Sequence, residues 1–213
     1  MQIAMDLHDE LGSGLGSIGL LANVAADLGE PAGGQRKLAE QIADTAASLG
    51  TSMSDIVWSL RPEAAQLRSL AARLHERASI LFPGDVPTVK VVQPDTWPRD
   101  ELDLTARRNL YAIAVEAMHN AAKHSRATHV ELFIGHDASD FIVRVSDDGE
   151  GFDLEAMAAS TTGGLGLRSM RIRARDMGAR LHVGGRPHGG GTIVEVRLAR
   201  RNRQRERGES RLT

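Results

Sequence analysis

The sequence contains no cysteine, which excludes disulfide bonds, thiolate catalysis, iron–sulfur clusters and cysteine zinc sites. Aromatic residues make up only 3% of the chain, too few for the stacking platforms that bind single-stranded nucleic acid. No apolar run approaches the ~18 residues that a membrane span needs, and the first ten residues lack the layout of a signal peptide. These absences favour a folded protein located in the cytoplasm.

Length and charge divide the chain into parts. Its 213 residues exceed one typical domain of ~100–150, so we expect two modules. Residues 199–213 carry six arginines against two glutamates, so the net charge of −2 leaves the other 198 residues at −6. We expect a disordered, Arg-rich tail at 199–213 and, because the body is acidic, no nucleic-acid partner.

The N-terminal part has the pattern of a helical hairpin. Apolar residues recur at alternating steps of three and four through residues 1–28 and again through 35–60, with a Gly- and Pro-containing break at 29–34. Two amphipathic helices cannot enclose a core alone, so each apolar stripe needs a partner. We therefore expect residues 1–64 to form a dimeric four-helix bundle with a second copy of the chain.

The pattern changes after a linker and third helix at 65–85, where the helix covers 66–81. From residue 86 short strands alternate with helices, which predicts an α+β sandwich domain at 86–198. Strands joined by short turns are expected to pair as antiparallel hairpins, with the helices covering one face of the sheet. The expected elements are strand 88–92, helix 101–124, strands 128–135 and 140–146, helix 165–177, and strands 180–184 and 192–198.

Residues 14–19 satisfy the G-x-G-x-x-G pattern of dinucleotide sites. That fingerprint needs a preceding strand and a helix that begins at the glycines, whereas these glycines lie inside a heptad-patterned helix, so we expect no nucleotide there. Each glycine costs ~0.5–1 kcal/mol of helix stability relative to alanine. Close helix packing and a pliable signalling segment both explain them, and the sequence leaves the two open.

Four polar or glycine-rich segments of the C-terminal module suit a nucleotide. Glu116 and Asn120 lie four residues apart on one helix face; the other three segments are DDGEGF at 147–152, GGLGLR at 163–168 and GGGT at 189–192. Glycines let backbone N–H groups approach phosphates, and a helix N-terminus favours an anion. An amide oxygen is a hard ligand suited to Mg²⁺, and a carboxylate at a strand end can accept a hydrogen bond from an exocyclic amine. These features suit ATP with Mg²⁺.

Together, the four segments in this order resemble the ATP-binding module shared by gyrase-type ATPases, heat-shock chaperones, mismatch-repair ATPases and histidine kinases. The form EAMHNAAKHS, with DLHDELG at the start and DIVWSLRPE after residue 54, resembles sensor histidine kinases of the nitrate-sensor and thermosensor type, whose acceptor motif is a His-Asp pair. The resemblance covers nearly the whole chain except the Arg-rich tail.

The resemblance implies a role for each matched residue. His8 would be the phosphoacceptor, and Asp9 would orient its imidazole and take its proton. Asn120 would coordinate Mg²⁺ with support from Glu116, and Asp147 would bind adenine. Residues from about 153 to 165 would form a lid over ATP. The other matched nucleotide-binding positions are Lys123, His124, Gly149, Gly151, Gly163, Gly164, Leu165, Gly166, Leu167 and Thr192.

The implied function is an ATP-dependent histidine autokinase that passes its phosphoryl group to an aspartate on the receiver domain of a response regulator. Ser13 stands where relatives that also dephosphorylate the regulator carry an amide side chain, so the sequence leaves phosphatase activity open. Only seven residues precede His8, so we expect this chain to be the cytoplasmic portion of a longer receptor. The alternatives are a nucleotide-binding signalling scaffold and an ATPase of the gyrase or chaperone type.

Overall fold

The chain divides into two compact units, Met1–Arg61 and Pro62–Thr213, in the computed structural model. The residues that the structure describes are 61–151, 165–186 and 190–200, together with Ile18, Ile42, Ala46, Asp55 and 57–59. The seven isolated residues of the first unit are helical. The predicted hairpin pairing, the four-helix bundle, the glycines of 14–19 and residues 201–213 of the Arg-rich tail fall outside the described residues. The tail was expected to begin at 199, but Ala199 ends the last strand and the Arg200 Nε donates to Asp100 Oδ2 at 2.8 Å, so the ordered domain extends to residue 200.

The second unit follows the predicted order of elements closely. The largest difference is the start of the long helix, expected at residue 101 and found at Leu104. Asp103 caps this helix, since its Oδ1 accepts a hydrogen bond from the Ala106 N–H at 2.8 Å. The elements are η1 Pro62–Ala65, α3 Leu67–Leu81, β1 Thr88–Val92, α4 Leu104–His124, β2 His129–His136, β3 Asp140–Asp147, α6 Leu165–Asp176, β4 Arg180–Gly185 and β5 Thr192–Ala199.

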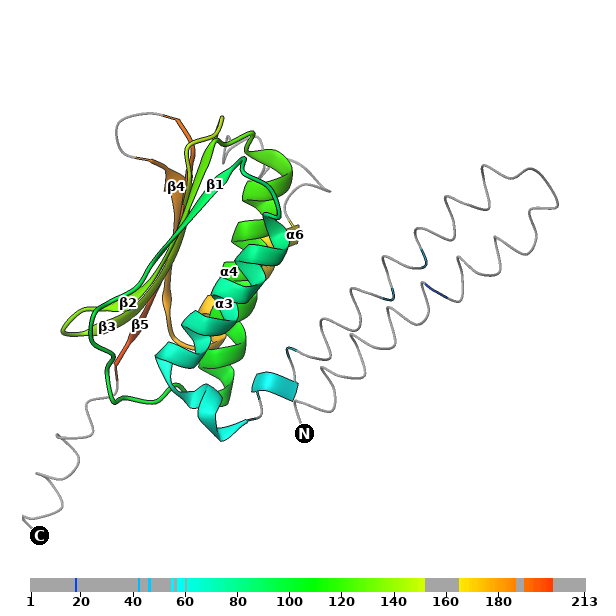
Figure 1. The fold of residues 1–213 in the computed structure, drawn as a ribbon. Helices are drawn as coiled ribbons and strands as arrows, with labels where there is room; N and C mark the ends of the chain where they lie inside the picture. The colour runs from blue at the N-terminus through cyan, green and yellow to red at the C-terminus, as the bar shows by residue number, and fades with distance from the viewer. Residues whose placement is uncertain are drawn as a thin grey trace, which may run out of the picture. The chain divides into compact units, whose positions relative to one another are not determined.

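The five strands form one mixed sheet in the order β1-β2-β3-β5-β4. β1 pairs with β2 in parallel, while β2–β3, β3–β5 and β4–β5 are antiparallel. The predicted antiparallel hairpins are therefore confirmed, and α4 supplies the crossover that a parallel pair needs. Figure 1 shows α3, α4 and α6 on one face of the sheet, which confirms the predicted α+β sandwich.

The core lies between the helices and this face of the sheet. Its fully buried side chains come from α3, α4 and alternate positions of the strands, as the helical and strand periodicities require. Burying one such side chain contributes about 1.5–3 kcal/mol. Examples with almost no exposure are Leu70, Leu74, Leu110, Ile113 and Leu132.

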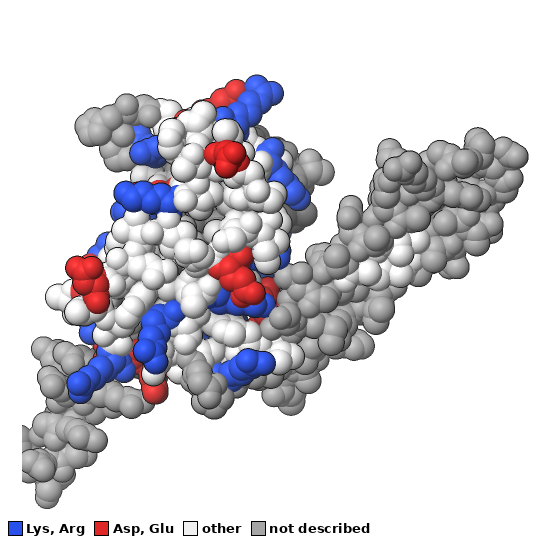
Figure 2. All heavy atoms as spheres, in the orientation of Figure 1, with Lys and Arg blue, Asp and Glu red and all other residues white. Residues whose placement is uncertain are grey.

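The opposite face of the sheet carries cross-strand ion pairs. Lys90 on β1 faces Glu131 on β2, with Nζ and Oε2 3.8 Å apart. Arg144 on β3 contacts Glu131 at 3.6 Å and Glu195 on β5 at 3.4 Å. Each such pair contributes only about 0.2–1 kcal/mol to stability. We therefore infer that these charges mainly keep the sheet face opposite the helices hydrated. Figure 2 shows Lys and Arg interspersed with Asp and Glu on the surface in view.

The turn between β2 and β3 is fixed by Asp137. Its Oδ1 accepts hydrogen bonds from the N–H groups of Ser139 and Asp140, each at 2.8 Å. These two bonds, with the hydroxyl of Ser139 and the charge of Arg197, lower the pKa of Asp137 to about 2. The segment that the sequence marked as a short turn is therefore closed by its own aspartate. Among the described helices, none is both long and apolar enough to cross a membrane.

Candidate nucleotide site

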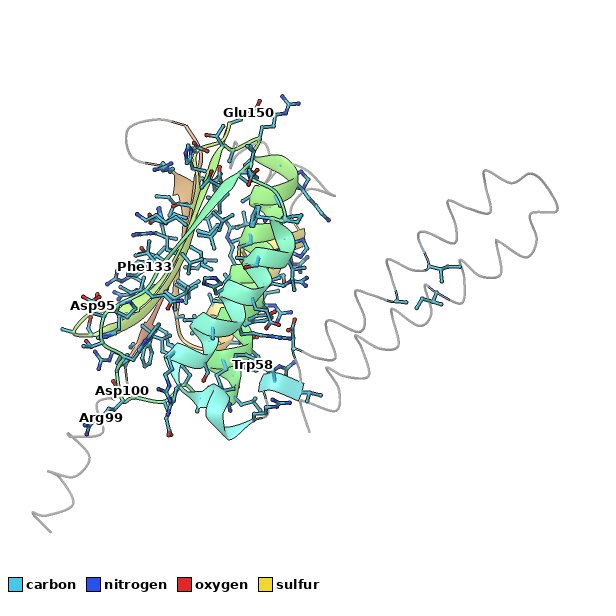
Figure 3. The ribbon with its side chains drawn as sticks, viewed as in Figure 1. Trp58, Asp95, Arg99, Asp100, Phe133 and Glu150 are labelled. Atoms are coloured by element: carbon cyan, nitrogen blue, oxygen red, sulfur yellow. The ribbon has the colours of Figure 1, made fainter. Side chains whose placement is uncertain are left out.

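The candidate site lies where β3 ends and β5 begins. Glu150, just after β3, is at one end of the sheet, and Asp100 is at the other (Figure 3). The end that carries Glu150 also brings together Asp147, the last residue of β3, and Gly191, which precedes β5. Two of the four segments singled out in the sequence, 147–152 and 189–192, therefore have described residues in this region.

Asp147 has the surroundings expected for a carboxylate that binds a base. Its side chain points to the helical side of the sheet, and the residue is 5% exposed. Oδ1 accepts a hydrogen bond from the Gly149 N–H at 3.0 Å. Oδ2 forms no hydrogen bond to any described residue, so this oxygen remains able to accept one from a ligand amine.

The loop before β5 packs on the backbone of Asp147, and only a glycine fits there. A Cβ atom on Gly191 would lie 2.0 Å from the Asp147 carbonyl oxygen, and Gly191 has a φ of +89°. A Cβ on Gly151 would in turn lie 3.2 Å from the Gly191 carbonyl oxygen. The predicted neighbours of Asp147, Gly149 and Gly151, are thus adjacent to it, and their loop touches the loop before β5.

The N-terminus of α6 lies against the middle of the α4 motif. A Cβ on Gly166 would be 2.1 Å from Glu116 Oε1, so the absence of a side chain at 166 lets the carboxylate approach this end of α6. Asn120 follows one turn after Glu116 and is half-buried. A carboxylate and an amide oxygen beside a helix N-terminus fit a Mg²⁺ ion bridging to phosphate.

The structure describes some of the remaining predicted site residues and leaves others undescribed. Lys123 and His124 are exposed in the last turn of α4, Leu167 is buried in α6, and Thr192 opens β5 half-buried. Leu165 is the first residue of α6. The structure does not describe His8, Asp9, Gly163 or Gly164, so their predicted roles stay predictions.

His119, beside Asn120, faces α3 rather than the nucleotide motifs. The guanidinium of Arg77 on α3 lies 3.4 Å from its ring, between Nη2 and Nε2. Burial lowers the pKa of His119, the charges of Arg77 and Lys123 lower it further, and Glu116 opposes them. A lowered pKa favours the uncharged ring, which is the form that can contact a guanidinium without repulsion.

Asp148 supports the site in a way that the sequence did not indicate. Its Oδ1 accepts hydrogen bonds from the N–H groups of Thr128 and His129 at 2.8 and 2.7 Å, and its Oδ2 accepts one from the Thr128 hydroxyl at 2.7 Å. Next to it, the Glu150 N–H donates to the Ser125 carbonyl at 2.9 Å. The loop after α4 thus fixes the loop that carries Asp147. Two adjacent aspartates in a sequence do not reveal which one faces the pocket.

We predict that Asp148→Ala lowers the free energy of unfolding by about 2–3 kcal/mol, because two backbone N–H groups and a hydroxyl lose an ionised acceptor. Asp148→Asn should lose less, because an amide oxygen still accepts from the backbone. The hydrogen bond from the His129 backbone N–H leads the causes that hold the pKa of Asp148 well below its ordinary 3.8.

A carboxylate whose pKa is lowered by folding stabilises the fold fully at pH values above its unfolded-state pKa. This stabilisation is lost as the pH falls toward its folded-state pKa. The stability gap between the parent and Asp148→Asn should therefore be constant above about pH 5 and should shrink below about pH 4. Urea denaturation across this range measures the gap. A gap independent of pH would contradict the assignment.

This arrangement, a buried strand-end carboxylate, glycine loops that close on it and a carboxylate–amide pair at a helix N-terminus, defines an ATP-binding α+β sandwich. Residues 105–202 match the family described as "Histidine kinase-, DNA gyrase B-, and HSP90-like ATPase", and residues 1–65 match the family described as "Histidine kinase". The chain belongs to the sensor histidine kinases, as its motifs predicted.

Curated relatives agree over most of the chain. It is 27% identical to sensor histidine kinase ComP of Bacillus subtilis over 85% of this chain and 24% of ComP. It is 26% identical to sensor histidine kinase LiaS of Bacillus subtilis over 92% of this chain and 53% of LiaS. The chain thus spans between a quarter and about half of the length of these relatives.

Solved structures show the same fold. The histidine kinase domain of the blue-light activated kinase EL346 from Erythrobacter litoralis matches with a TM-score of 0.54 and 23% identity, over 86% of this chain and 95% of that domain. The histidine kinase AdeS of Acinetobacter baumannii matches with a TM-score of 0.58 and 14% identity, over 92% of this chain and 98% of that chain.

Proposed function

We propose that this chain transfers the γ-phosphoryl group of ATP to His8 and then passes it to an aspartate on the receiver domain of a response regulator. The observation that carries the proposal is the site around Asp147, Glu116 and Gly166, in a chain whose first 65 residues match the histidine kinase family. An ATP site alone would fit many activities, but the matched acceptor segment supplies a histidine.

The nucleotide would be held by residues from the end of α4, the loop after β3, the start of α6 and the start of β5. Asp147 would accept a hydrogen bond from the exocyclic amine of adenine through Oδ2. Gly149 and Gly151 would shape the loop beneath the base. The phosphates would be surrounded by residues of three segments. These are Lys123 and His124 at the end of α4, residues 163–167 at the start of α6, and Thr192 at the start of β5. Mg²⁺ held by Asn120 and Glu116 would neutralise phosphate charge.

The acceptor chemistry follows from the His8-Asp9 pair. An imidazole with a pKa near neutrality exposes an unprotonated nitrogen at cellular pH, and the Asp9 carboxylate fixes its tautomer and takes the ring proton. The nitrogen forms a bond to the γ-phosphorus, the bond from that phosphorus to the bridging oxygen breaks, and ADP leaves. The protein's share of catalysis is positioning and charge neutralisation.

The proposal assigns a task to each predicted part of the chain. Residues 1–64 would form the phosphoacceptor hairpin and pair with a second copy in a homodimer, because their apolar stripes need a partner. Residues 65–85, whose helix α3 contributes buried side chains to the core of the second unit, would join this hairpin to the catalytic elements at 86–198. The receiver domain would take the phosphoryl group from His8. We place the kinase reaction in the cytoplasm.

Incubation of the full chain with Mg²⁺ and γ-³²P-ATP tests the proposal. The expected result is one labelled phosphate that is stable in alkali and lost in acid, as a phosphoramidate requires. Steady phosphate release with no labelled protein would indicate an ATPase instead. Nucleotide binding with neither label nor release would indicate a scaffold.

A further inference from the structure

Arg77 is a cation from outside the predicted motifs that reaches the α4 part of the site. α3 and α4 lie side by side and run in the same direction (Figure 1), since the Leu102 N–H donates to the Ala65 carbonyl near their N-terminal ends and Arg77 meets His119 near their C-terminal ends. Arg77 lies in the third turn of α3 and is partly exposed. Its contact on α4 is the residue directly before Asn120.

The charge of Arg77 has no counter-charge within the described part of the chain. Its Nη2 contacts the ring of His119, and its Nε is buried without a hydrogen-bond partner there. Glu116, one turn before His119 on α4, has its Oε1 against Gly166 of α6. Partial burial of a guanidinium without a paired carboxylate costs free energy unless an anion binds to it.

The geometry of α4 places this cation beside the phosphate-binding face. At 3.6 residues per turn, Glu116, Asn120 and Lys123 fall within about 60° of one another around the helix axis. His119 lies at the edge of that face, about 40° from Lys123. The ring therefore holds the Arg77 guanidinium at the border of the surface on which the proposed Mg²⁺ and phosphates would sit.

We propose that Arg77 is a further phosphate-binding cation of the nucleotide site, positioned by its contact with His119. This inference rests on the proposed function, because the anion it requires is the triphosphate of the bound nucleotide. Lys123 and Arg77 then approach the phosphates from α4 and α3. The guanidinium can donate two parallel hydrogen bonds to phosphate oxygens, which an ammonium cannot.

A series of ligands with increasing charge tests the proposal. Calorimetric titration of the full chain uses adenosine, ADP and the non-hydrolysable imido analogue of ATP, each with Mg²⁺. Arg77→Met removes the charge and keeps much of the side-chain volume, Arg77→Lys keeps the charge, and Arg73→Met is the control. Arg73 lies one turn earlier on α3 and pairs with Glu76 of the same helix.

We expect Arg77→Met to weaken binding of the ATP analogue at least roughly tenfold, the loss expected for one hydrogen bond to a charged group. Binding of ADP should weaken less, adenosine affinity should change by less than about twofold, and Arg77→Lys should recover most of the loss. Unchanged adenosine binding also shows that the variant is folded. Arg73→Met should match the parent throughout.

Two results would overturn the inference: an equal loss for all three ligands, which indicates a packing role, or no loss for the ATP analogue. Failure of the proposed function gives a different pattern. If the parent binds the analogue with the Arg77 dependence but forms no phosphohistidine, the kinase proposal fails and the Arg77 assignment stands. If the parent binds no nucleotide, both fail.

Discussion

Replacing His8 by glutamine is expected to reduce autophosphorylation by more than about 10³-fold, because the amide lacks the nucleophilic nitrogen to which the γ-phosphorus would bond. Glutamine is polar and similar in length, so the acceptor helix should keep its pattern. Nucleotide affinity should stay at the parental value, because all the proposed ATP-binding residues, Arg77 included, lie outside the acceptor segment at 1–64. Phos-tag electrophoresis after incubation with Mg²⁺ and ATP measures the phosphorylated fraction.

The matched control for this variant is His75→Gln. His75 is an exposed histidine on α3 whose ring forms no hydrogen bond to a described residue, while its backbone carbonyl accepts one from the Ser79 hydroxyl at 3.1 Å. This variant should label as the parent does. If His8→Gln also labels as well as the parent, the acceptor is another residue and the proposed phosphotransfer from His8 is wrong.

Replacing Asp147 by asparagine is expected to weaken ATP binding about 10²-fold while leaving the fold intact. The amide oxygen can keep the bond from the Gly149 N–H, which Oδ1 now accepts at 3.0 Å. The NH₂ group must then occupy the Oδ2 position, where it meets the exocyclic amine of adenine, donor against donor. Fluorescence titration with a labelled nucleotide, competed with ATP, measures the loss.

The same substitution should shift the base preference. Inosine triphosphate carries an oxygen where adenine carries its amine, and the new NH₂ group can donate to that oxygen. The ratio of ATP to inosine triphosphate affinity should therefore fall in Asp147→Asn. Asp85→Asn, at an exposed position before β1, is the control and should leave both affinities unchanged. An unaltered ratio in Asp147→Asn would show that Asp147 does not read the base.

Local patterns predicted the elements of the second unit well. The alternation in β1 and the 3.6-residue period of α3 and α4 arise because the side chains on one side of each element are buried. The positions of the apolar residues in the sequence therefore predicted these elements. The motifs were also informative, because Glu116 and Asn120 are spaced by one helical turn. The start of α4 at Leu104, three residues later than expected, follows from its cap, because Asp103 accepts the hydrogen bond from the Ala106 N–H.

Contacts between distant segments could not be predicted in the same way. β5 lies between β3 and β4, so the last strand in sequence is an interior strand of the sheet and not an edge strand. Asp148 accepts hydrogen bonds from a loop twenty residues earlier in the chain, and Arg77 contacts His119, which is 42 residues away. No local period carries such information, because these pairs form only when the sheet and helices have packed.

The amino-acid sequence by itself determined the family, the order of strands and helices, and the residue types suited to ATP, Mg²⁺ and a histidine acceptor. These depend on short-range spacing along one helix, strand or loop. Only the tertiary structure decided which oxygen of Asp147 remains open, that Gly191 must lack a side chain against its carbonyl, and that Arg77 lies beside the α4 motif. Each of these facts is a distance between segments far apart in the chain, which packing alone fixes.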